Sequence, residues 1–155
     1  MFDVLAFVYE NYDPGESYPE PANLQRRLSS VGFESDEIGE AITWLQGLEG
    51  AAHPSAPMPW LIQPQAGSVR IYPRHERVHL GARALGFLHF LESAGKMSAA
   101  LREVVIDRAM AAPGGPVSLD DLKLIVLMVY WRFGEVPDAL VLDELCDNAS
   151  ARVAH

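Results

Sequence analysis

The chain has 155 residues, of which 49% are apolar, and it carries a formal net charge of −9 at neutral pH. This apolar fraction is typical of globular proteins and excludes a disordered chain. The length suits one domain that folds without metal ions or disulfides. The net charge disfavours nucleic acid as a partner, because a phosphate backbone is bound by several lysines or arginines on one face.

The cysteine content and the apolar runs indicate where the protein works. Cys146 is the single cysteine, so no intrachain disulfide can form. Residues 1–5 carry no basic side chain ahead of the apolar run, unlike a signal peptide. The longest apolar run, Leu124 to Trp131, is far shorter than the roughly 20 residues of a membrane span. We therefore expect a protein of the reducing cytosol that does not enter membranes.

Helical spacing and end signals predict three helices in the first third of the chain. The first begins at Phe2 and ends before the turn at Asp13. The second begins at Pro21 and ends at Gly32, a residue suited to the left-handed position after a helix. Ser35 begins the third, and two acidic residues follow in its first turn, where the helix dipole favours them.

Residues 50–67 contain glycines and prolines that exclude a helix. Short apolar segments at 60–62 and 69–72 predict two strands, with a turn at 64–67 between them. Two helices followed by a β-hairpin are typical of a winged helix.

The rest of the chain predicts helices only. One spans 73–93, another begins at the cap residue Ser98, and a loop at 113–116 precedes a helix over 118–133. This last helix is apolar on all sides, which predicts a position at the centre of a bundle, with an obligate interface as the alternative. A final helix begins at Pro137.

Together these elements predict a mostly α, formally α+β fold. It consists of a winged-helix-like helical hairpin with a short β-hairpin, followed by a C-terminal helical bundle. We expect an N-terminal unit over residues 1–72 and a bundle over 73–155, packed as one compact body.

His75-Glu76-Arg77-Val78-His79 matches the H-E-x-x-H pattern of zinc peptidases, in which two histidines on one helical face bind zinc and the glutamate activates water. A catalytic zinc needs a third protein ligand, and the extended pattern fails because Ala82 and Leu85 occupy the positions of its glycine and third histidine. The match is best explained as a coincidence on a solvated helix start. We expect no metal or other cofactor.

Arginines form the one basic stretch that could meet an acidic partner. They lie in the second predicted helix and around the start of the fourth. The candidate partner-binding residues are Arg26, Arg27, Arg70, Arg74, Arg77 and Arg83. The favoured interpretation is that these charges only balance the acidic third helix, and partner binding is the alternative.

Several segments, taken in order, resemble the bacterial Smg family and cover the chain to about residue 145. They are Met1–Leu5, Gly32-Phe33, Ala41–Leu45, Arg70–Tyr72, Gly86–Leu88, Phe90–Glu92, Arg102–Arg108 and Asp120–Lys123. The resemblance implies a short cytosolic bacterial protein of unassigned molecular function, whose gene often neighbours one for a DNA-processing protein. The family is not defined by a His-Glu-x-x-His signature, and the proline-rich loop at 54–64 departs from its pattern.

The chain shows no nucleotide-binding loop, no paired acid and base and no complete ligand set. The favoured hypothesis is a non-enzymatic adaptor or regulatory protein that binds a protein partner. A winged-helix protein that binds nucleic acid is the alternative, and a zinc-dependent hydrolase acting through His75, Glu76 and His79 is the weakest of the three.

Overall fold

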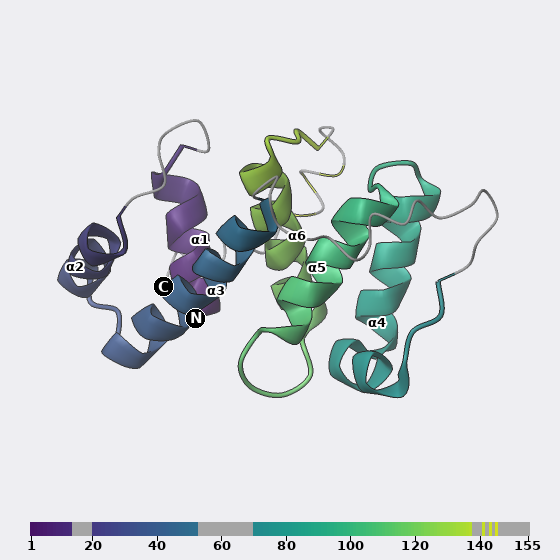
Figure 1. The fold of residues 1–155 in the computed structure, drawn as a ribbon, viewed down its shortest axis with the longest axis horizontal. Helices are drawn as coiled ribbons and strands as arrows, with labels where there is room; N and C mark the ends of the chain where they lie inside the picture. The colour runs from purple at the N-terminus through teal and green to yellow at the C-terminus, as the bar shows by residue number, and fades with distance from the viewer. Residues whose placement is uncertain (14–19, 53–69, 138–140, 142, 144, 146–155) are drawn as a thin grey trace.

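The computed structural model describes residues 1–13, 20–52 and 70–137, together with residues 141, 143 and 145. Within these residues the chain forms six bounded α-helices and no strand (Figure 1). They are α1 (Phe2–Asn11), α2 (Pro21–Val31), α3 (Ser35–Ala52), α4 (Arg74–Ser93), α5 (Ala99–Met110) and α6 (Leu119–Phe133). Val141, Asp143 and Leu145 are also helical, whereas Pro137, the predicted start of the last helix, is not; residues 138–140, 142, 144 and 146–155 lie outside the described part.

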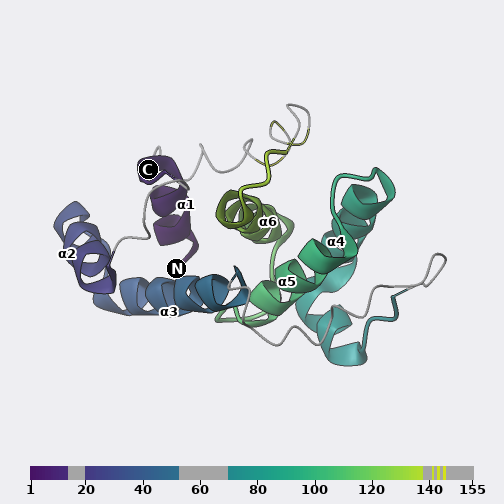
Figure 2. The ribbon, with the colours of Figure 1, turned by 45° about the horizontal axis from the view of Figure 1, so that its top comes forward.

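The helices are spread along the long axis of the molecule, with α2 at one end and α4 at the other (Figures 1 and 2). Between these ends lie α1, α6 and α5, while α3 runs from beside α2 to beside α5. Contacts of α1 with α6, and of α3 with α5 and α6, join residues on both sides of residue 72, the predicted boundary between the two units.

Helix α6 lies at the centre of the bundle, as its apolar sequence predicts. Every residue from Leu122 to Tyr130 is buried, and α6 contacts α1, α3, α4 and α5. Each fully buried large apolar side chain stabilises the fold by roughly 1.5–3 kcal/mol. The polar end of Tyr130 is also satisfied, because its hydroxyl donates a 2.6 Å hydrogen bond to the Lys96 carbonyl. Burial raises the pKa of this hydroxyl to about 12.

Local signals set the helix ends. The Ser98 hydroxyl accepts a hydrogen bond from the Leu101 amide at 3.2 Å, and the Ser118 hydroxyl accepts one from the Asp121 amide at 3.1 Å. Gly32 ends α2 with φ at 108°, a left-handed conformation that favours glycine. These boundaries confirm the predicted helix from Pro21 to before Gly32, the helix start after Ser98 and the helix that ends at Phe133. The prediction that no helix extends past residue 50 is wrong, because α3 continues to Ala52.

The predicted α+β class, with its winged-helix-like β-hairpin, is wrong, because the described residues are helical and contain no strand. Residues 70–72, assigned above to the second strand, form an unpaired lead into α4. A preference for strand-forming residues indicates a half-buried, extended backbone, and it does not require that the backbone pair with a second strand. Here Arg70 and Tyr72 are half-buried through side-chain contacts. The first predicted strand, at 60–62, lies outside the described residues.

None of the helices in the described part of the chain is both long enough and apolar enough to cross a membrane.

Candidate partner-binding surface

Helix α4 is divided by a kink at Gly81, whose φ of 73° and ψ of 168° are not helical. This backbone conformation is open essentially only to glycine. The sequence predicts one long helix over residues 73–93. In the structure it is two shorter helices set at an angle, as Figure 2 shows at the α4 end. We name the short first part, residues 74–80, the arm.

His79 holds the arm against the loop between α5 and α6. Its carbonyl, left without a helical partner by the kink, accepts a 2.8 Å hydrogen bond from the Val117 amide. Its ring Nε2 lies 3.1 Å from the Ala109 carbonyl oxygen, and because a carbonyl only accepts, Nε2 carries the proton. Leu80, the last residue of the arm, is buried. The arm is thus fixed at its C-terminal end.

Arg70 and Arg102 are held in a partly buried ion-pair network just before and beneath the arm. The Arg70 guanidinium lies 2.6 Å from Glu76 and 2.7 Å from Glu103. Arg102 lies 2.9 Å from the same Glu103 carboxylate and also pairs with Glu92. The network joins the lead into α4 with both parts of α4 and with α5.

The pKa shifts of this network follow from its geometry. Burial by itself would raise the pKa of Glu103, but hydrogen bonds from Arg70 and Arg102 outweigh it and hold that pKa below its ordinary value of 4.5. Burial by itself would lower the pKa of Arg70, and its bonds to Glu76 and Glu103 raise it instead. Glu103 and Arg70 are therefore both charged at neutral pH, and because the Arg70 guanidinium is bonded to Glu103 and Glu76 it offers no free cation to a partner.

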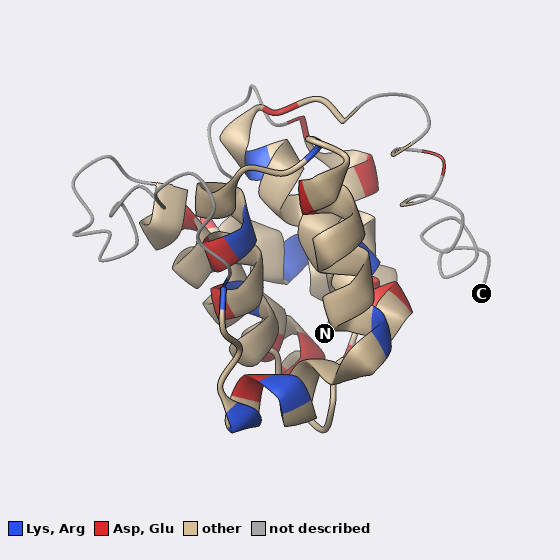
Figure 3. Cartoon of the chain, turned by 90° about the vertical axis from the view of Figure 1, so that its right-hand side faces the viewer, with Lys and Arg blue, Asp and Glu red and all other residues tan. Residues whose placement is uncertain are grey.

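Three of the six predicted partner-binding residues gather at the arm. Arg74 and Arg77 lie on it and Arg83 follows the kink; all three are exposed. Within the described part of the chain, their guanidinium groups make no hydrogen bond or ion pair. Figure 3, which views the α4 end of the molecule, shows blue segments on the short ribbon of the arm at the bottom.

Arg26 and Arg27 lie apart from the arm, on α2 at the opposite end of the molecule (Figure 1). Arg27 stacks over the Tyr12 ring at 5.2 Å, and Arg26 bonds the Asn23 side chain. The structure therefore divides the predicted set: Arg74 and Arg77 lie on the arm and Arg83 just past its kink, whereas Arg26 and Arg27 lie on α2.

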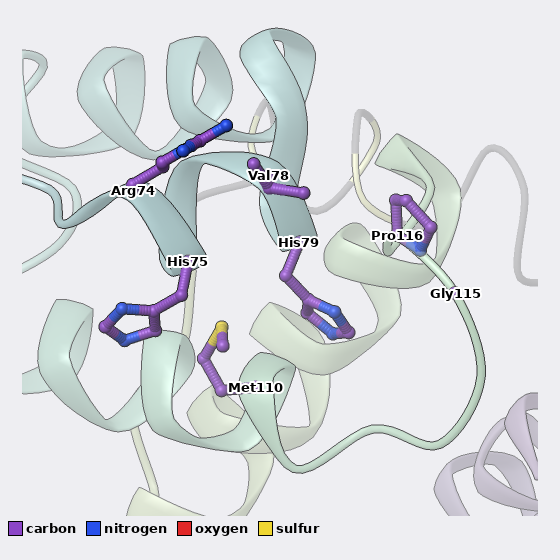
Figure 4. Close-up of a pocket in the computed structure, with 7 residues that line it drawn as sticks. All are labelled: Arg74, His75, Val78, His79, Met110, Gly115 and Pro116. Carbon is purple, nitrogen blue, oxygen red and sulfur yellow. The ribbon is translucent and has the colours of Figure 1, made fainter.

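A pocket of about 660 Å³ opens beside the arm (Figure 4). It is lined by Arg74, His75, Val78, His79, Met110, Gly115 and Pro116. Figure 4 shows Met110 between the rings of His75 and His79, with Pro116 on the far side of His79. Val78 is 64% exposed, and nearby in the sequence Ile71 is 86% exposed. Uncovered apolar side chains thus lie next to uncovered arginines.

Sequence reasoning missed the apolar part of this surface. Val78 stands one helical turn after Arg74 and Met110 stands at the end of α5, so only the fold brings them together. An available signal was Val78 itself, an apolar residue on the polar start of a helix.

The His-Glu-x-x-His residues do not form the arrangement that a zinc peptidase uses. Glu76 is bound to Arg70, and the Nε2 proton of His79 is committed to the Ala109 carbonyl. His75 is exposed. No group of three or more histidine, cysteine, aspartate or glutamate side chains able to hold a metal ion occurs among the described residues.

A second pocket, of about 500 Å³, lies where α3 meets α5 and is lined in part by Trp44 and Arg108. These residues bond one another across the helices: the indole of Trp44 donates to the Arg108 carbonyl at 2.8 Å, and Arg108 donates to the Trp44 carbonyl at 3.3 Å. Arg108 also pairs with Asp107 at 2.6 Å. The polar groups of Trp44, Arg108 and Thr43 in this pocket are already engaged, so it is the weaker candidate for binding.

The fold and the surface define a small helical protein with a buried central helix and an exposed, basic, partly apolar arm. The chain belongs to the family described as "Protein of unknown function (DUF494)", whose model matches residues 1–155. Relatives named "Protein Smg homolog" are similar over their full length and over all of this chain: 51% identical in Leptothrix cholodnii, 49% in Methylibium petroleiphilum and 44% in Bordetella avium. They confirm the Smg resemblance. No solved structure matches the chain.

Proposed function

We propose that this protein is a non-enzymatic adaptor or regulator of the cytosol that binds a protein partner through the arm and its pocket. One observation carries the proposal: Arg74, unpaired within the described residues, lines the pocket together with the exposed Val78, and the equally unpaired Arg77 precedes Val78 on the arm. Arginine is enriched in protein interfaces, and apolar contacts at their centre provide much of the binding energy.

The arrangement of the other charges supports a protein partner over nucleic acid. Arg70 is satisfied internally, and Arg26 and Arg27 lie at the far end, so the arm presents two exposed arginines, with Arg83 after the kink, in a chain of net charge −9. Binding of duplex DNA depends on many contacts between basic side chains and phosphates, and each contact that is missing lowers the affinity. An apolar pocket adds nothing to phosphate binding, whereas it suits a protein side chain.

Site-specific photocrosslinking in the native cell tests this function. A photoreactive residue replaces Val78 in one variant and Val31 in the other; Val31 is a comparably exposed valine of α2, 54% against 64%. The expected result is a discrete crosslinked species that contains a second protein and forms only from position 78.

Equal crosslinking from both positions, or none from position 78, contradicts the proposal. Recovery of nucleic acid instead of protein at position 78 contradicts it as well. Circular dichroism of both variants establishes that each is folded before the comparison is made.

A further inference from the structure

We infer that the arm binds an acidic segment of its partner, which inserts an apolar side chain between Val78, Met110 and Pro116 and places carboxylates on Arg74 and Arg77. This inference rests on the proposed function and adds the chemistry of the partner to it. It follows from the size of the pocket, the sign of the charge beside it, and the spacing of Arg74 and Val78 along the arm.

The pocket is large enough for a short segment of chain. Its volume of about 660 Å³ falls within the range of roughly 300–1,000 Å³ that is typical of ligand sites. Carbon atoms of Val78, Met110 and Pro116 are exposed in it, and Val78 keeps 64% of its surface accessible. Covering these atoms with an apolar side chain removes them from water, which favours binding by roughly 25 cal/mol for each Å² buried.

Arg74 is the one Lys, Arg, Asp or Glu among the described residues that line the pocket, although the whole chain is strongly negative. Glu76 is the one acidic residue of the arm, and it lies 2.6 Å from Arg70 in a network whose two arginines and three glutamates keep a formal charge of −1. Arg74 and Arg77 therefore act on the surroundings without a compensating neighbour on the arm. An acidic segment is repelled by most of the protein, with its net charge of −9, and attracted here.

The spacing on the helix sets how the two kinds of contact combine. Arg74 and Val78 are four residues apart on one helical face, so their side chains are neighbours at about 5–6 Å between Cβ atoms. A guanidinium accepts a carboxylate through two parallel hydrogen bonds. A partner that fits both groups carries its carboxylates within a few residues of an apolar side chain.

Selection from a library of random 12-residue peptides displayed against the full-length protein tests the inference. Enriched peptides are synthesised with a fluorescent label, and their dissociation constants are measured by fluorescence polarisation. The expected peptides are rich in aspartate and glutamate around one or two of leucine, isoleucine, phenylalanine and methionine. Their affinity is expected to fall steeply as salt is added, because exposed charges are screened.

Matched variants locate the binding. Val78→Asp and Arg77→Glu each weaken the binding of these peptides roughly tenfold or more, because each places a negative charge against the acidic segment. Val31→Asp and the double variant Arg26→Glu/Arg27→Glu make the same chemical changes on α2 and leave the affinity unchanged within about twofold. Because Arg77 is exposed and unpaired within the described residues, its variant keeps the test valid if Val78→Asp folds poorly.

Several results would overturn the inference. They are enrichment of neutral or basic peptides, no enrichment at all, affinity that the arm variants leave unchanged, and displacement of the peptides by a 20-nucleotide single-stranded DNA at lower concentration than by peptide. Self-association in sedimentation that Arg77→Glu abolishes would also overturn it, since the occupant is then a second copy of the chain. If position 78 crosslinks a protein while the selected peptides are not acidic, only the inference fails. If acidic peptides bind the arm and no crosslink forms in the cell, the proposed function fails.

Discussion

Arg70 and Arg74 lie four residues apart in sequence but in different environments. Arg70 is half-buried between Glu76 and Glu103, whereas Arg74 is exposed on the arm and makes no ion pair with a described residue. The same side chain thus stabilises the fold in one place and remains available to a partner in the other. The difference depends on whether the fold brings carboxylates to the guanidinium: Glu76 comes from the following turn of α4 and Glu103 from α5.

The largest effect is expected for Arg102→Met, which leaves Glu92 and Glu103 without this partner. We expect the free energy of unfolding to fall by about 3 kcal/mol, the low end of the range for breaking a buried pair, because the Glu92 side chain stays 34% exposed. Urea denaturation followed by circular dichroism measures it. Arg83→Met, the same change at an exposed position, serves as the control and should cost less than about 0.5 kcal/mol. Equal losses in the two variants would remove the distinction between paired and unpaired arginines.

Gly81→Ala is expected to cost about 2 kcal/mol, because alanine is strained at the φ and ψ of this kink. The control is Gly86→Ala, in the helical second part of α4, where a Cβ meets nothing within 4 Å. That change should stabilise the protein by roughly 0.5–1 kcal/mol. Thermal unfolding distinguishes the two. A neutral result at Gly81 would show that the arm continues α4 without a break.

Gly47→Ala tests the packing of Arg108, the paired arginine of the second pocket. The expected loss of stability is smaller than at Gly81. A Cβ at Gly47 would overlap the Arg108 guanidinium, which crosses α3 to reach the Trp44 carbonyl. We expect a cost of about 1 kcal/mol as Arg108 is displaced. In an Arg108→Ala background the same change should become favourable by roughly 0.5 kcal/mol, since only helix propensity remains. A double-mutant cycle with no coupling would contradict this packing.

The smallest effects on stability are expected for the exposed arginines on the arm and just after it. Arg74→Ala, Arg77→Ala and Arg83→Ala should each change the free energy of unfolding by less than about 0.5 kcal/mol, since these side chains are exposed. Urea titrations check this, and a loss above 1 kcal/mol from any of them would mean that the residue has a structural partner. These variants therefore test the comparison between paired and exposed arginines at its exposed members.

The helix ends could be predicted from the sequence because the signals for them are local. Ser98 and Ser118 cap the helices that follow them, and Gly32 ends α2 in the left-handed conformation. The apolar sequence of α6 likewise predicts a helix covered on all sides, and burial from Leu122 to Tyr130 confirms it.

What the sequence did not reveal depends on contacts between distant segments. Residues 69–72 have strand-forming side chains, but Arg70 is held by Glu103, which is 33 residues away in the chain. An isolated glycine within a helical pattern gives no indication that Gly81 breaks the helix. The sequence shows the basic stretch, but only the fold separates Arg70 from Arg74 and Arg77. Sequence spacing could not show that Met110 completes the pocket beside them.

The two hydrogen bonds of His79 have a mechanical consequence. Its ring is tied to Ala109 at the end of α5, and its carbonyl to Val117, just before Ser118 caps α6. Any partner that swings the arm about Gly81 must break both bonds, and the chain entering the central helix then loses its support. Binding at the arm and the position of α6 are therefore coupled through the ring and the carbonyl of His79.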